Sequence, residues 1–133
     1  MDAMIWCAGV VQLCIAAANF FAPRKFGYRE NLARVSPLVR HVFVVHSVYI
    51  VLVVVMFAAL CGLFAPDLAG ASPLGRFLSG CLALFWGLRL VIQLAVYDRA
   101  VRRQNRAVDL LFIAAFVYLT GVFGAAYGFP CAP

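Results

Sequence analysis

Four long apolar stretches limit the folds available to this chain more than any other feature. They run from Met4 to Phe21, Val42 to Phe64, Phe77 to Val96 and Leu110 to Tyr127. A helix needs about 20 apolar residues to cross the hydrocarbon core of a bilayer, so each stretch is long enough to span it. Only 12% of the residues are charged and 66% are hydrophobic, against about 25% and about 45–50% in soluble domains. Because a small water-soluble domain cannot bury so much apolar surface, the sequence indicates an integral membrane protein.

Helices are expected for these stretches, because the alternation of polar and apolar residues that is typical of a membrane β-barrel is missing. Backbone groups in hydrocarbon must be bonded within the protein, which a helix achieves alone. We predict an all-α fold in which the chain, 1–133, forms a single transmembrane domain, a four-helix bundle with short connections. The predicted spans are about 4–21, 38–64, 75–97 and 108–127.

Two Ser-Pro pairs mark expected helix starts, because serine caps a helix and proline is favoured at its first position. The pairs are Ser36-Pro37 and Ser72-Pro73. In the connection 24–36, Tyr28, Leu32 and Val35 recur at helical spacing. This segment is either a short helix on the membrane surface or a solvated loop.

Basic residues gather in two of the connections. The connection 22–41 holds Arg24, Lys25, Arg29, Arg34 and Arg40, and the connection 97–107 holds Arg99, Arg102, Arg103 and Arg106. The positive-inside rule predicts that both connections are cytoplasmic and that both termini lie outside. The net charge of +6 also predicts attraction to membrane lipids with anionic headgroups. No nucleic-acid partner is expected, because the charges flank the spans instead of lining a groove with stacking aromatics.

A guanidinium interrupts the third apolar stretch, at Arg89 in "FWGLRLVIQLAVYD". Its backbone is ~12 Å from the helix end expected near Asp98. Arginine at this depth either extends to the headgroups or faces the protein interior. Gln93, one helical turn later, shares its face and favours the interior position.

Other helices supply polar residues at a depth similar to that of Arg89. We predict a polar layer near the cytoplasmic side, which either binds a ligand or joins the helices by hydrogen bonds. Its candidate members are Asn19, His46, Arg89, Gln93, Tyr97 and Asp109. No catalytic residue is predicted, because the sequence has no phosphate loop, nucleophile elbow or His-Glu-x-x-His motif.

The two histidines, His41 and His46, project ~140° apart around a helix and cannot hold one metal ion together. No metal or cofactor is therefore predicted. Bound lipid is expected, and haem shared between two protomers is an alternative. The chain has five cysteines and no Cys-x-x-Cys pair, so they are either apolar fillers or include one bridge, such as Cys61 to Cys131.

Ser79, Ala83 and Gly87 recur every four residues, nearly opposite Arg89. Small residues at this spacing allow close helix contacts, which favours a homo-oligomer or a larger membrane complex. The strings "FFAPRKFGYRENLARVSPLVRHVF" and "FWGLRLVIQLAVYD" resemble those of small uncharacterised bacterial four-helix membrane proteins. The resemblance implies this topology in a bacterial inner membrane, and no activity.

Three functions fit these features. The leading hypothesis is a non-catalytic accessory or scaffold subunit that packs against other membrane proteins. An alternative is a binding or transport module for a lipid, a quinone or another small amphiphile, with a polar site near His46, Arg89 and Gln93. A further alternative is a membrane redox or enzyme subunit.

The topology predicts opposite labelling of two cysteines. A membrane-impermeant thiol reagent added outside should modify Cys131 and should not modify Arg102→Cys, because the second site lies in a basic cytoplasmic connection. Permeabilised cells provide the control, since both sites should then react. Labelling in the reverse sense would overturn the orientation.

Overall fold

The computed structural model describes residues 1–25, 36–95 and 106–130. Its four long helices are α1 (Asp2–Lys25), α3 (Pro37–Leu63), α5 (Pro73–Ala95) and α7 (Arg106–Gly128), and a short helix, α4 (Ala65–Ala69), follows α3. Each long helix contains a segment long and apolar enough to cross a bilayer. The predicted all-α, four-helix transmembrane fold is confirmed. The segment 24–36, predicted as either a surface helix or a solvated loop, falls mostly on residues 26–35, which lie outside the described residues.

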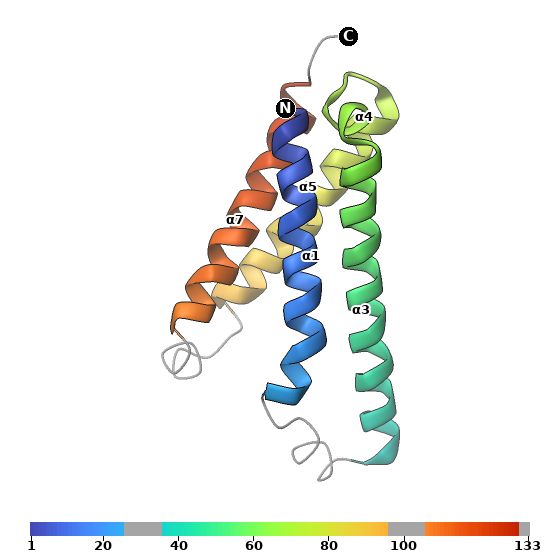
Figure 1. Ribbon diagram of the computed structural model, residues 1–133, viewed down its shortest axis with the longest axis vertical. Helices are drawn as coiled ribbons and strands as arrows, with labels where there is room; N and C mark the ends of the chain where they lie inside the picture. The colour runs from blue at the N-terminus through green and yellow to red at the C-terminus, as the bar shows by residue number, and fades with distance from the viewer. Residues whose placement is uncertain (26–35, 96–105, 131–133) are drawn as a thin grey trace.

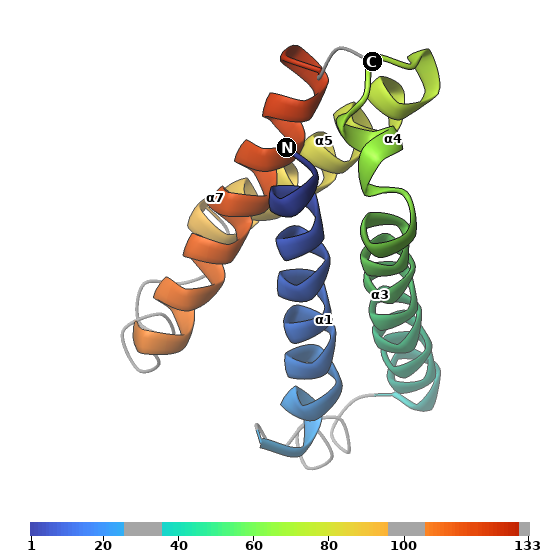
Figure 2. The ribbon, with the colours of Figure 1, turned by 45° about the horizontal axis from the view of Figure 1, so that its top comes forward.

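The helices form two hairpins, α1 with α3 and α5 with α7 (Figure 1). The start of α1, the end of α7 and α4 lie at one end of the molecule. Lys25, Pro37, Ala95 and Arg106 lead into the two basic connections at the other end. Figures 1 and 2 both show the hairpins diverging towards that end, which we call the open end.

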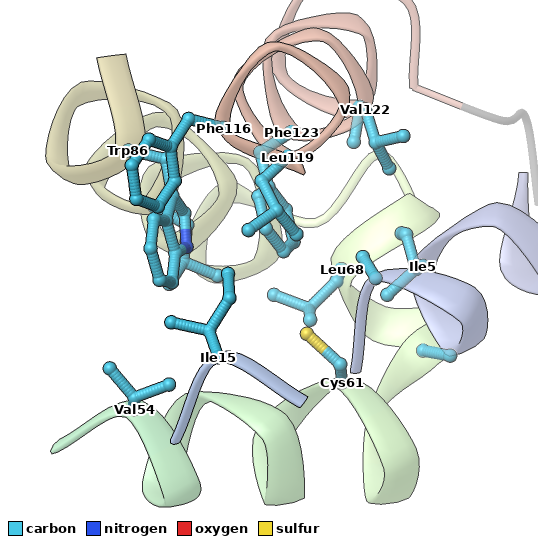
Figure 3. Packing of buried hydrophobic residues seen from close by; sticks show 14 of the residues in the cluster. Ile5, Ile15, Val54, Cys61, Leu68, Trp86, Phe116, Leu119, Val122 and Phe123 are labelled. Atoms are coloured by element: carbon cyan, nitrogen blue, oxygen red, sulfur yellow. The ribbon is translucent and has the colours of Figure 1, made fainter. Parts of the chain in front are cut away.

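The apolar core extends from α4 to about the middle of the long helices, and Figure 3 shows how its side chains pack together. Leu68 of α4 is fully buried against residues from the long helices, including Ile5 and Cys61. Farther along the core, the Trp86 ring stacks on Phe116, with centroids 5.6 Å apart and an angle of 23° between the rings. Large aromatic side chains contribute much of the buried area in such a core, so α5 and α7 are held together by this stack.

The two Ser-Pro pairs behave differently. Ser72 caps α5, because the Gly75 N–H donates to its Oγ at 3.1 Å. Ser36 makes no side-chain capping bond at the start of α3. Ser36 is exposed, so the first N–H groups of α3 face the surroundings and need no partner from the protein.

The stripe of small residues on α5 packs within the chain. The Ser79 hydroxyl donates to the Leu68 carbonyl of α4 at 2.9 Å. A Cβ at Gly87 would lie 3.5 Å from Thr120 Cγ2 of α7. The stripe therefore brings α5 close to α4 and α7, and it does not support contact with a second subunit.

At Gly75, α5 passes very close to the backbone of α4. A Cβ at this position would overlap the Asp67 backbone carbonyl oxygen, which cannot turn aside as a flexible side chain would. Gly75→Ala should lower the free energy of unfolding by about 1–3 kcal/mol, the usual cost of overpacking. The measurement is denaturant unfolding in one detergent.

Gly124→Ala is the matched control, because nothing lies within 4 Å of its Cβ position. Alanine is the better helix former by about 1 kcal/mol, so this variant should be unchanged or slightly more stable. Equal effects of the two substitutions would contradict the close α4–α5 contact.

Candidate functional site

Three of the expected polar residues meet between α5 and α7. The Gln93 amide Nε2 donates to Asp109 Oδ1 at 2.8 Å. Arg89 Nη1 donates to Gln93 Oε1 at 3.4 Å, and the guanidinium carbon lies 5.2 Å from the centroid of the Phe116 ring. We call Arg89, Gln93, Asp109 and Phe116 the Arg89 cluster. In it, the amide joins a guanidinium on one side to a carboxylate on the other.

Helical spacing explains how the sequence builds this cluster. Arg89 and Gln93 are one turn apart and share a face of α5, and Asp109 and Phe116 are two turns apart on α7. Gln93 is only 7% exposed, so this face lies against the neighbouring helix. Asp109 lies in the first turn of α7, where a negative charge interacts favourably with the helix dipole. The expected pairing of Arg89 with Gln93 is confirmed.

The Arg89 cluster combines a guanidinium, an amide, a carboxylate and an aromatic ring. Placing an arginine at the centre of a membrane helix costs about 2.5–3.5 kcal/mol on insertion scales. The hydrogen bond to Gln93 and the contact with the Phe116 ring offset part of this cost, since a cation over an aromatic face gains about 0.5–2 kcal/mol. The cluster joins α5 to α7.

Asn19 and His46, two other predicted members of the layer, do not join this cluster. The Asn19 amide donates to the Ile15 carbonyl of its own helix at 2.9 Å. His46 is exposed on α3, away from the strip formed by Val54 and neighbouring buried residues. Tyr97 lies outside the described residues.

His46 instead lines a shallow hollow of about 320 Å³ on the outer surface of α3. The residues that line it are His41, Val42, Val45, His46 and Tyr49. Both histidines thus border one hollow, although they project to opposite edges of it. Within the described residues, no group of three or more histidine, cysteine, aspartate or glutamate side chains could hold a metal ion.

One buried polar pair was not singled out from the sequence. Gln12 of α1 is fully buried, and its amide donates to Cys61 Sγ of α3 at 3.3 Å. Cys61 is a free thiol, and Cys131 lies outside the described residues. Neither Gln12 Oε1 nor the buried Trp86 Nε1 has a hydrogen-bond partner among the described residues. The sequence signal for this pair is a single glutamine within an apolar stretch.

Comparison of the chain with protein-family models, with curated proteins and with solved structures finds no match. Function is therefore inferred from the geometry of the described residues.

Leucine substitutions at the two buried glutamines, Gln93 and Gln12, should change the free energy of unfolding by different amounts. Gln93→Leu removes the amide that donates to Asp109 and the acceptor for Arg89. Hydrogen bonds to charged groups contribute about 1.5–3 kcal/mol. The free energy of unfolding in detergent should therefore fall by about that amount. Thermal or denaturant unfolding measures the loss.

Gln12→Leu is the matched control. It removes a buried oxygen that has no partner among the described residues, a weak bond to sulfur and a bond to the Ala8 carbonyl of its own helix. Stability should stay within about 0.5 kcal/mol of the parent or rise, because an unsatisfied buried polar group is itself destabilising. A larger loss for Gln12→Leu than for Gln93→Leu would contradict the bridging role of Gln93.

Proposed function

We propose that the protein is a membrane-embedded accessory subunit that holds a transmembrane segment of another protein between its two hairpins at the open end. One observation carries the proposal. On α1 and α3, the sides that face the core near α4 become less buried and carry polar side chains towards the open end.

On α1, this change occurs within one turn. Ile15 and Ala16 are 6% and 4% exposed. Asn19 follows them on the same face and is exposed. On α3, Val54 is buried, and Ser47, two turns earlier on the same face, is only half-buried.

The second hairpin also becomes polar towards the open end, but its polar residues bond to one another and Gln93 stays buried. Trp86 and Phe116 are buried in the core, and beyond them come Arg89, Gln93 and Asp109. Apolar side chains at an open end face lipid without cost, whereas polar groups gain from hydrogen-bonding partners that lipid chains lack. A partner helix with polar side chains of its own supplies one to the exposed Asn19, at about 0.6 kcal/mol per interhelical bond.

A second candidate function is a module that binds a lipid, a quinone or another small amphiphile. The observation that favours it is the Arg89 guanidinium, which lies over the Phe116 ring and is only partly buried. An anionic or carbonyl headgroup would accept a hydrogen bond there, with its apolar tail directed along α5 and α7.

We place the protein in a bacterial inner membrane, with both basic connections in the cytoplasm and both termini outside. The helix ends that lead into these connections lie together at the open end, which supports one orientation for both under the positive-inside rule. The open end then faces the cytoplasmic leaflet.

Site-specific photo-crosslinking in cells tests this function. A photoreactive residue in place of Asn19 should give an adduct with another protein. The same residue in place of Leu84, which is 74% exposed on α5, should give lipid adducts only. The adducts are separated by electrophoresis and identified by mass spectrometry.

Lipid adducts alone at both positions would contradict the subunit proposal. A single small molecule retained after purification in mild detergent, and lost in Arg89→Leu, would establish the amphiphile module in its place.

A further inference from the structure

We propose that the outer face of α3 binds the α3 of a second copy, so that the protein forms a parallel, two-fold symmetric dimer in the membrane. This face lies opposite the strip that packs on α1, and the proposal does not depend on the partner at the open end.

The outer face carries a heptad pattern along the whole of α3. Side chains recur at alternating steps of four and three residues, which is the spacing of a helix–helix seam. The members of this seam are Leu38, Val42, Val45, Tyr49, Leu52, Met56, Ala59 and Leu63. All eight are exposed, so no described part of the chain covers the seam.

The direction of the seam follows from the buried strip. Val54, Ala58 and Cys61 are the buried residues of α3, and they face α1. At 100° per residue, Val45 lies ~180° from Val54 around the helix. The seam therefore points away from the rest of the bundle, where another molecule can reach it.

The hollow on α3 has the form that a heptad seam needs. In the heptad notation, Val42 and Tyr49 occupy position a and Val45 occupies position d, with His41 at g and His46 at e. These five residues line the hollow of about 320 Å³. In a coiled coil, a side chain of the partner enters such a hole between a, d and flanking positions.

The histidines identify the partner as a second copy. In parallel helix pairs, residues at g interact with residues at e five positions later on the other helix. His41 and His46 are five positions apart, so each His41 meets the partner's His46, twice by symmetry. A neutral imidazole has one donor and one acceptor, and each such pair can therefore form a hydrogen bond without any third group.

Membrane geometry agrees with this arrangement. Two copies related by a two-fold axis along the membrane normal have the same orientation, and their α3 helices run parallel. Lipid chains would cover the valine and leucine side chains equally well, but they offer no hydrogen-bond partner to His46 or Tyr49. The dimer is therefore favoured over a lipid-covered face.

Disulfide trapping with mixed copies tests the register directly. One differently tagged copy carries His41→Cys and the other carries His46→Cys, and both are reconstituted together in phosphatidylcholine vesicles. Oxidation should join the two substituted positions in the mixture, whereas neither variant alone should form that link. Peptide mass spectrometry distinguishes this link from any that involve the native cysteines.

Two further variants compare the seam with its flank. Val45→Cys should form a symmetric disulfide, and Val44→Cys, one residue off the seam and 49% exposed, should not. Equal linking at both positions, or linking at neither, would overturn the dimer.

Energy transfer between labelled copies in vesicles measures the affinity. His46→Leu should weaken dimerisation about eightfold, the effect of two average interhelical hydrogen bonds. Unchanged thermal unfolding would show that the fold is retained. A chain that stays monomeric in vesicles at every protein-to-lipid ratio would overturn the proposal, and so would a different protein crosslinked to the seam in cells.

Discussion

The contact of α4 with the four long helices is the interaction on which the bundle depends. Leu68 is fully buried, and Ala65 and Ala69 beside it are nearly so. The Leu68 carbonyl accepts the Ser79 hydroxyl, and Gly75 allows α5 to approach the Asp67 backbone. Because α4 lies at the end where α1 starts and α7 ends, it joins the hairpins there and leaves the other end open. The open end is thus a consequence of where the chain places the short helix α4.

Polar groups within the spans are handled in different ways. The Arg89 cluster satisfies a guanidinium between α5 and α7, so its charge is compensated inside one hairpin. Gln12 is buried with an oxygen that has no partner among the described residues. His46 and Tyr49 lie on an outer surface. Because hydrocarbon offers no hydrogen bonds, His46 and Tyr49 on the outer surface of α3 gain most from a protein partner.

The length of the apolar stretches sufficed to predict four helices, and the four-residue spacing of Arg89 and Gln93 sufficed to predict their contact. The position of His46 was not predictable in the same way, because α3 is apolar on all sides and its sequence does not show which side packs on α1. Helix α4 was not predicted, since its five residues carry no periodicity of their own. Its role depends on contacts with distant parts of the chain, which no local pattern encodes.

The open end and the seam use different sides of α3, and their geometry limits the assembly. Ser47 faces the same side as Val54, towards α1, whereas Val45 faces away. A second copy on the seam therefore leaves the open end of each copy accessible. The two-fold axis would place the two open ends on opposite flanks of the dimer. Such an assembly would hold one partner segment per copy, and the two segments would be separated by the paired α3 helices. The dimer would then bind two partner helices and keep them apart.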